Sequence, residues 1–289
     1  MPIHLYIDQY FQHHPEERIT GVTVKNPPIE KRPKIAKIEE ALVSFHTKEI
    51  PIRIYIPNED KNHPLMIFFH GGEYISGGIE SHDVSCRLIS SLSGYKVIAV
   101  DYAITSTSTF DTVLKDCYSV TQWIIEHQDK LGFTHQIAIG GPSFGALIAT
   151  SIAFQCLASS TYRFNKQILY FPIIDLSKRI KDSDFQSRQL FNGKYGIDLT
   201  ISQLINGQNL TFFKNKELLG QMPDTLIFTA EYDPLCDEGE WYAEQLMQAG
   251  VNVRHLQFDG NIHGFMQGFP GSPDYMRGYE VTTEFLVDG

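Results

Sequence analysis

The chain has 289 residues, of which 42% are hydrophobic and 20% are charged, so it can bury a large core and is not an intrinsically disordered protein. Its formal net charge of −10 at pH 7 argues against nucleic acid or an anionic membrane surface as the main partner, since both are bound through clustered Lys and Arg. A short cationic cluster is followed by glutamates, which indicates a solvated loop and not a binding surface. The cluster comprises Lys31, Arg32, Lys34 and Lys37.

The cysteines lie far apart, form no CxxC pair and have no metal-ligand spacing with a histidine. Their surroundings are typical of helix faces on which a free thiol packs as a small hydrophobic group. The four are Cys86, Cys117, Cys156 and Cys236. No stretch approaches the roughly 18 apolar residues of a membrane span, and the first residues lack the basic region of a secretory signal. We therefore expect a reduced, cytoplasmic protein without a membrane span.

Strand patterns follow one another from about residue 38. An amphipathic helix is predicted before them, within residues 3–14. Residues 38–45 and 50–57 alternate apolar and polar side chains, which predicts an antiparallel pair. Continuous apolar runs then indicate strands buried on both faces, as in a parallel sheet. These runs lie at 65–70, 96–102, 136–141, 167–173 and 224–230, and a further strand is predicted at 252–258.

Helical spacing separates the predicted strands. The helical segments are 80–93, 109–131, 144–158, 237–249 and 273–287. This alternation predicts an α/β fold with a doubly wound, mostly parallel sheet of eight strands and a helical cap. The expected organisation is an N-terminal cap segment at 1–37, a first core part at 38–175, a cap insertion at 176–220 and a second core part at 221–289.

The stretch 141–145, Gly-Pro-Ser-Phe-Gly, follows an apolar strand and precedes an apolar helix. A G-x-S-x-G turn in this context holds its serine in strained geometry above the sheet edge, and the glycines let the helix pack back on the strand. The serine also lies at the positive end of the following helix. The pattern therefore predicts that Ser143 is a nucleophile, in preference to an ordinary turn residue.

A serine hydroxyl needs a base, and the base needs an orienting carboxylate. On such a sheet the three follow in the order Ser, acid, His, each just past a strand. Asp233 is the first aspartate past the strand at 224–230, and His263 lies in the loop after the last strand. Other candidates fit less well: Asp224 precedes its strand, Asp237 is expected to be a helix N-cap, and His255 is mid-strand. We expect Ser143, Asp233 and His263 to form the catalytic site, without a metal or a cofactor.

The oxyanion of an acyl-transfer intermediate needs backbone N–H donors. One is expected from Phe144, the residue after the nucleophile. A glycine loop after an early strand supplies the others, and HGG at 70–72 follows the apolar run 65–70. The predicted oxyanion hole therefore comprises the N–H groups of Gly71, Gly72 and Phe144.

Together these motifs resemble the hormone-sensitive-lipase-like branch (family IV) of the α/β-hydrolases, which contains bacterial carboxylesterases and acetyl esterases. HGGEYISGG at 70–78 resembles that branch's HGGGF loop, and GGPSFGA at 140–146 resembles its GDSAGG turn. AEYDPLCDEGEWYAEQLMQAG at 230–250 is similar to its acid loop and the helix that follows, and HGF at 263–265 carries the histidine. The resemblance covers about residues 40–287 and implies an α/β-hydrolase fold and a serine carboxylesterase acting on small, short-chain acyl esters.

Some residues depart from the pattern of this branch. Glu73 replaces the last glycine of the loop, and Pro142 replaces the acidic residue before the serine. Phe144 replaces a small residue, so we expect it to narrow the acyl pocket. The Arg and APE of the branch's DYRLAPE stretch are replaced by Ala103 and by Ser and Thr residues, so the support beneath the glycine loop must differ.

Two functional alternatives to an esterase stay open. The same machinery can hydrolyse an amide-like formyl group, as in arylformamidases with a similar HGG loop. A non-catalytic ligand-binding protein of this fold is disfavoured because all three residues of the catalytic site are present. The partner is expected to be a small ester molecule, and a homodimer is one of the oligomeric states left open.

Aromatic residues of the cap could line the substrate pocket or pack the cap onto the core. They are Tyr6, Tyr10, Phe11, Phe191, Phe212 and Phe213.

Overall fold

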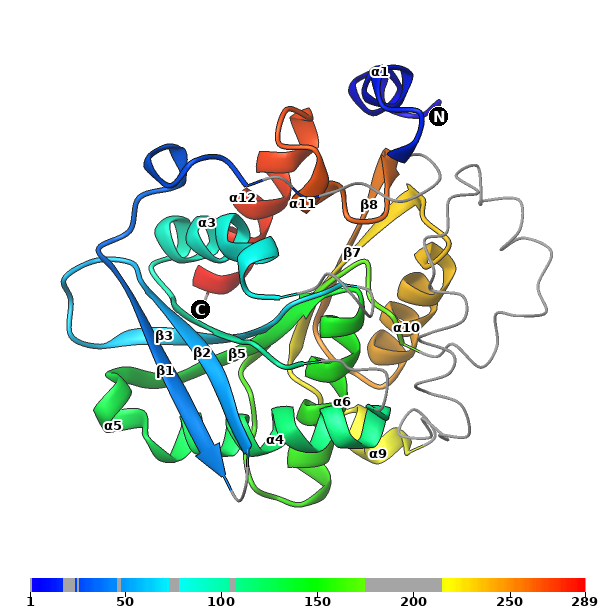
Figure 1. The fold of residues 1–289 in the computed structure, drawn as a ribbon. Helices are drawn as coiled ribbons and strands as arrows, with labels where there is room; N and C mark the ends of the chain where they lie inside the picture. Colours follow the sequence, from blue (N-terminus) through cyan, green and yellow to red (C-terminus); the bar gives the residue numbers. More distant parts are fainter. Residues whose placement is uncertain are drawn as a thin grey trace.

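One eight-stranded sheet forms the centre of the described part of the chain (Figure 1). The computed structural model describes residues 2–17, 24, 26–45, 48–72, 78–103, 108–174 and 215–288. The strands are β1 (Lys37–Phe45), β2 (Lys48–Ile56), β3 (His63–Phe69), β4 (Lys96–Val100), β5 (Phe133–Pro142), β6 (Lys166–Tyr170), β7 (Asp224–Tyr232) and β8 (Val253–Ile262). Their order is β1-β2-β4-β3-β5-β6-β7-β8; β2 is antiparallel to both β1 and β4, and all other pairs are parallel. The predicted mostly parallel sheet is confirmed.

Helices cover both faces of this sheet (Figure 1). One face carries α4 (Phe110–Glu126), α6 (Phe144–Ala158) and α10 (Cys236–Gln248). The other carries α3 (Asp83–Ser93) and α12 (Pro273–Val287), which pack against each other. Shorter elements are α1 (Leu5–His13), α5 (Gln128–Leu131), α9 (Lys216–Leu219), α11 (Phe265–Gly268) and two 3₁₀ turns, η1 (Ile29–Lys31) and η2 (Glu80–His82). The doubly wound arrangement follows from this placement.

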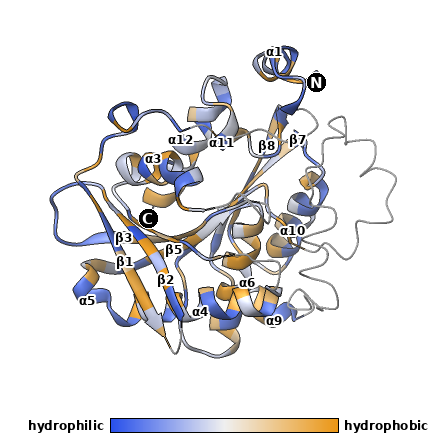
Figure 2. Ribbon diagram, viewed as in Figure 1, coloured by the Kyte–Doolittle hydropathy of each residue, from blue (hydrophilic) through white to orange (hydrophobic). Residues whose placement is uncertain are grey.

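Strand β3 shows why the central strands read as continuous apolar runs. Leu65, Ile67 and Phe69 belong to the core beneath α4 and α6. Met66 and Phe68 belong to the core beneath α3 and α12. Side chains alternate between the two faces, so a strand buried on both sides must be apolar at every position. Figure 2 shows the hydrophobic residues along the strands and helix α6.

Helix α1 packs beside the loop that follows β8. Its buried side chains are Ile7 and Phe11, which lie on one face of the helix. The backbone N–H of His4 donates to the carbonyl of Gly260 at 2.8 Å, which ties the start of the helix to β8. Three aromatic side chains of α1 contact the ring of Phe269, namely those of Tyr6, Tyr10 and Phe11. These contacts favour the packing role for the three, whereas Phe191, Phe212 and Phe213 lie outside the described residues.

An ion pair with a buried aspartate holds the segment that follows η1 against the rest of the protein. Arg32 places Nη1 2.6 Å from Asp83 Oδ2 and 2.7 Å from Glu80 Oε1. Arg53 and Arg87 also pair with Asp83, whose side chain is 1% exposed. Burial alone would raise the pKa of the Asp83 carboxyl, but the hydrogen bonds from Arg32 and Arg87 hold that pKa below its usual value. The prediction of a solvated loop is therefore wrong for Arg32.

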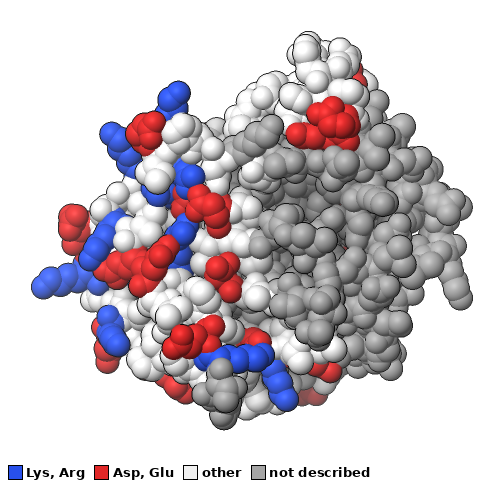
Figure 3. All heavy atoms as spheres, in the orientation of Figure 1, with Lys and Arg blue, Asp and Glu red and all other residues white. Residues whose placement is uncertain are grey.

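The described surface mixes charges of both signs. On the face shown in Figure 3, Lys and Arg side chains lie next to Asp and Glu side chains. Lys37, for example, pairs with Glu39, and Lys48 pairs with Asp116. None of the described helices combines the length and the apolar character needed to span a bilayer.

Two further expectations have different outcomes. All four cysteines lie buried in helices as free thiols, as predicted. The cap insertion at 176–220 lies mainly outside the described residues, which resume at residue 215 just before the short helix α9. The boundary near residue 220 therefore stays a prediction.

Candidate active site

Ser143 occupies the turn between β5 and α6. Its backbone has φ 54° and ψ −118°, a left-handed φ that is unfavourable for a residue with a side chain. The glycines on either side are required by the close approach of β3, since a Cβ at Gly141 or at Gly145 would overlap the carbonyl oxygen of Phe69. Helix α6 begins at Phe144, so its positive end lies next to the serine. The predicted strained turn is present.

Asp233 and His263 come from the ends of neighbouring strands. Asp233 directly follows β7, and His263 directly follows β8. The imidazole Nε2 lies 3.1 Å from Ser143 Oγ, and Nδ1 lies 2.8 Å from Asp233 Oδ2. The structure therefore brings together the three side chains that the sequence singled out, although they are far apart along the chain.

The surroundings of Asp233 select one form of the imidazole. The aspartate is fully buried, and its Oδ1 accepts the N–H of Leu235 at 2.7 Å. Its other oxygen, Oδ2, accepts the proton on His263 Nδ1. The lone pair on Nε2 then faces the hydroxyl of Ser143, as general-base chemistry requires.

The alternative residues lie elsewhere. Asp224 begins β7, at the end of the strand opposite to Asp233. His255 lies within β8 and is hydrogen-bonded to Thr229 of the neighbouring strand. The prediction that Asp237 caps a helix is wrong, because Leu235 holds the N-cap position of α10 and Asp237 lies in the first turn.

The glycine loop follows β3 beside the serine turn. Gly72 has φ 131°, which favours glycine, and a Cβ at Gly71 would lie 2.9 Å from the carbonyl oxygen of Pro142. Pro142 therefore packs directly against the loop. The N–H of Gly71 donates to Nε2 of His82 at 3.4 Å, a contact that the sequence did not predict. Glu73 lies outside the described residues.

His82 is suited to accept this bond because it is neutral. Burial, with the nearby ring of His70, lowers the pKa of His82 to about 3. Its Nδ1 lies 2.9 Å from Ser81 Oγ, whose hydroxyl donates to the carbonyl of Gly78. A proton on Nδ1 therefore satisfies Ser81 and leaves Nε2 to accept from Gly71.

Tyr102 supports the loop from the other side. Its ring stacks on that of His70, with centroids 4.1 Å apart and 4° between the planes, and its hydroxyl donates to the His70 carbonyl. Both nitrogens of the buried His70 ring face carbonyl oxygens, those of Gly71 and Tyr102. Burial lowers the pKa of the His70 imidazole, and hydrogen bonding of the ring to backbone carbonyl oxygens opposes this effect. Tyr102 lies two residues past the end of β4, so its place at this edge of the sheet could have been found from the sequence, whereas nothing in the sequence pointed to His82.

Phe144 differs from its predicted role as a wall of the acyl pocket. Its side chain is fully buried and its ring contacts those of Tyr102 and Phe110, with centroids 6.3 and 6.1 Å apart. The ring therefore packs beneath the site, and the replacement of a small residue at this position is absorbed by the core.

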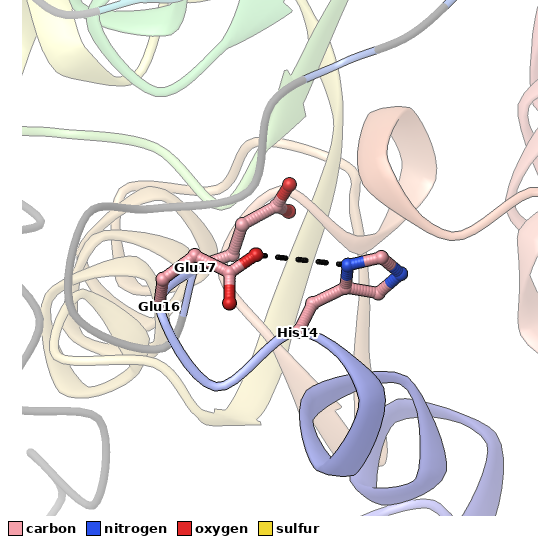
Figure 4. A group of neighbouring side chains, drawn as sticks. All are labelled: His14, Glu16 and Glu17. Carbon is pink, nitrogen blue, oxygen red and sulfur yellow. Dashed lines mark ion pairs between the residues drawn. The ribbon is translucent and has the colours of Figure 1, made fainter.

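Three side chains of residue types that can bind a metal ion lie together just after α1 (Figure 4). The ligand atoms of His14, Glu16 and Glu17 lie within 4.8 Å of one another. His14 pairs with Glu16 at 3.7 Å, and Glu17 accepts the hydroxyl of Tyr10 at 2.6 Å. These contacts tie the chain that follows α1 back to the helix. Nothing beyond proximity points to a cation, and we assign none.

A wound sheet with a serine on a strained strand-to-helix turn, and with an aspartate and a histidine past later strands, is the arrangement of an α/β-hydrolase. The family model for the α/β hydrolase fold matches residues 66–267. An arylesterase of Saccharolobus solfataricus is 31% identical over 94% of this chain and 87% of its own length. An ethyl acetate hydrolase of Pseudomonas putida is 30% identical over 75% of this chain and 72% of its own length.

Solved structures show the same likeness over nearly the whole chain. A hyperthermophilic esterase from the archaeon Pyrobaculum calidifontis has a TM-score of 0.81 at 25% identity, and 99% of this chain and 98% of that one are covered. A thermostable carboxylesterase cloned from a metagenomic library has a TM-score of 0.80 at 26% identity over 98% and 97% of the two chains. The chain belongs to the α/β-hydrolase family, and the resemblance to its esterases is confirmed.

Proposed function

We propose that this protein is a serine carboxylesterase that hydrolyses small carboxylic esters through Ser143, His263 and Asp233. The carrying observation is the continuous chain of contacts from Ser143 Oγ through both imidazole nitrogens to a buried carboxylate. The names of the relatives, an arylesterase and an ethyl acetate hydrolase, support an ester as the substrate.

In this mechanism His263 Nε2 accepts the hydroxyl proton of Ser143 as Oγ attacks the ester carbonyl carbon. The Asp233 carboxylate stabilises the imidazolium that forms and holds its ring. The tetrahedral intermediate collapses when the bond to the alcohol oxygen breaks, and the alcohol leaves with the proton from Nε2. Water then attacks the acyl carbon with His263 again as the base, which releases the carboxylic acid and restores the Ser143 hydroxyl.

The oxyanion donors in this proposal are the N–H groups of Phe144 and Gly72. Phe144 begins α6, and the first N–H groups of a helix have no acceptor within it. The contact between Gly71 and His82 supports a different role for Gly71, as a fixed point of the loop. Losing one oxyanion donor typically costs a factor of about 10²–10³ in kcat.

We also propose that residues 1–37 and 176–220 form the cap over this edge of the sheet. The position of α1 beside the loop that follows β8 supports the first segment. A cap over the carboxyl ends of the strands would shield the site from bulk solvent and limit the size of the ester that enters.

The test is hydrolysis of p-nitrophenyl esters by the wild type and by Ser143→Ala. We expect the variant to lose several orders of magnitude in kcat, given losses of about 10⁶ for comparable nucleophiles. Ser119→Ala, on the exposed side of α4, is the matched control and retains activity. The wild type is expected to hydrolyse the acetate faster than the decanoate. A Ser143→Ala variant that keeps most of its activity would contradict the mechanism.

A further inference from the structure

Phe171 has an unusual backbone for a large buried residue. Three described residues other than glycine have positive φ, namely Ser143, Ser160 and Phe171. Phe171 has φ 38° and its side chain is 1% exposed. A bulky side chain is a genuine outlier in this region, and the following Pro172 restricts the backbone further. Such strain persists where the surroundings enforce it, and it clusters at functional sites.

The backbone around Phe171 is bonded to both sides of Ser143. The N–H of Ser143 donates to the carbonyl of Tyr170 at 2.9 Å, and the carbonyl of Ser143 accepts from the N–H of Ile173 at 3.3 Å. Phe171 itself donates its N–H to the carbonyl of Phe228 on β7 at 2.7 Å. The turn at Phe171 therefore lets residues on its two sides hold the backbone of the serine from both ends.

The side chain of Phe171 points to the histidine. Its ring centroid lies 5.1 Å from that of His263, with 66° between the planes, and 5.8 Å from that of Phe265. The two imidazole nitrogens are already engaged by Asp233 and Ser143. The apolar phenyl ring forms no hydrogen bond with either imidazole nitrogen. By packing against the imidazole, it restricts tilting of that ring away from Ser143 Oγ.

We propose that Phe171 is a positioning residue that keeps the His263 imidazole aligned with Ser143 Oγ, an inference that rests on the proposed esterase function. One short segment thus fixes the nucleophile through its backbone and the base through its side chain. Alignment at this level matters, because a misplacement of about 1 Å can cost about 10²-fold in rate. The strained φ of Phe171 allows residues 170–173 to contact both the backbone of Ser143 and the imidazole of His263.

The experiment replaces the ring and compares it with an equally buried ring elsewhere. Phe171→Leu removes the contact with His263. Phe133→Leu is the matched control, since the Phe133 side chain is buried in the core and begins β5, at the end of that strand opposite to Ser143. Activity on p-nitrophenyl acetate is expressed per active site, titrated with a phosphonate that reacts with the serine. Proton NMR follows the low-field signal of the hydrogen bond between His263 Nδ1 and Asp233.

We expect Phe171→Leu to lose about tenfold to a hundredfold in kcat, with KM within about twofold of the wild type. Its low-field proton signal is expected to broaden or to disappear through faster exchange with water. Phe133→Leu is expected to lower stability by a similar amount, yet to keep both kcat and the signal. Phe171→Tyr keeps the ring and is expected to restore kcat to within about threefold of the wild type. Phe171→Met, which refills the volume without a ring, replaces the leucine variant if that variant folds poorly.

The proposal is overturned if Phe171→Leu keeps the wild-type kcat and NMR signal, or if Phe171→Leu and Phe133→Leu lose activity per active site equally. The second result would mean that Phe171 acts only through stability. Ser143→Ala in the same assay separates this proposal from the esterase function. If Ser143→Ala loses activity and Phe171→Leu loses no activity, only the proposed role of Phe171 is contradicted.

Discussion

Replacing Gly145 with alanine tests how tightly helix α6 packs on the end of β3. A Cβ at this position would lie 2.6 Å from the carbonyl oxygen of His70 and 2.8 Å from the carbonyl carbon of Phe69, and closer still to the oxygen of Phe69. The Phe69 oxygen would overlap most, and ordinary contact begins at 3.4 Å, so backbone atoms must move apart by more than an ångström. β3 is hydrogen-bonded on both sides within the sheet, and α6 is buried, so neither can shift freely.

We expect Gly145→Ala to lower the free energy of unfolding by at least about 2 kcal/mol. Overpacking typically costs about 1–3 kcal/mol, and overlap with backbone atoms that cannot shift freely places this position at the upper end of that range or above it. The better helix propensity of alanine offsets at most about 1 kcal/mol. The same shift would displace the N–H of Phe144, so activity per folded molecule is also expected to fall.

Urea unfolding of the wild type and two alanine variants provides the measurement. Gly78→Ala is the control, because its Cβ would have its nearest neighbour, Asp101 Oδ1, at an ordinary 3.5 Å. We expect this variant to be as stable as the wild type or slightly more so. A Gly145→Ala variant within about 0.5 kcal/mol of the wild type would refute the reasoning, since that is the scatter of substitutions that touch nothing important.

Two further predictions concern buried charge and a buried imidazole. Burial lowers the pKa of His82 from 6.5 to about 3, so below pH 6.5 the unfolded chain takes up a proton that the folded protein does not. As the pH falls from 6.5 to 3, the free energy of unfolding is therefore expected to fall by up to about 1.4 kcal/mol per pH unit, and by less in His82→Gln. If the free energy of unfolding depended equally on pH in the two proteins, His82 would not be neutral in the folded state. Arg32→Ala is expected to lower the free energy of unfolding in urea by about 1–3 kcal/mol, because the buried Asp83 carboxylate loses one of its arginine partners. Lys48→Ala, which removes an exposed ion pair with Asp116, is expected to lower it by only about 0–1 kcal/mol. Similar losses for the two would show that the Arg32 pair contributes no more than a surface pair.

The sheet and the site geometry were predictable from the sequence for related reasons. The apolar runs fixed the strands because a strand covered on both faces has no polar position, as Leu65 to Phe69 illustrate. Parallel strands share one carboxyl edge, so residues just past β5, β7 and β8 had to converge there. Ser143, Asp233 and His263 lie in hydrogen-bond range for that reason.

What the sequence did not predict depends on the directions of side chains and on strain. His82 lies in a helical segment that carries no catalytic pattern, and only the fold places its ring beside Gly71. The positive φ of Phe171 contradicts the preference of a residue before proline, so local propensity points the wrong way. Arg32 was taken as solvated because its partner Asp83 is distant in the sequence. Asp237 was misassigned because helix boundaries are set by the local backbone, which starts the helix two residues earlier.

The packing of α1 against Phe269 and β8 has a consequence for the order in which the protein is built. Helix α1 is synthesised before every strand of the sheet, whereas Gly260 and Phe269, which receive it, lie at the end of the last strand and after it. Contacts between distant parts of a chain form slowly, because a long loop must close before they stabilise anything. The loop that carries His263 therefore gains the support of α1 only after all eight strands have been synthesised.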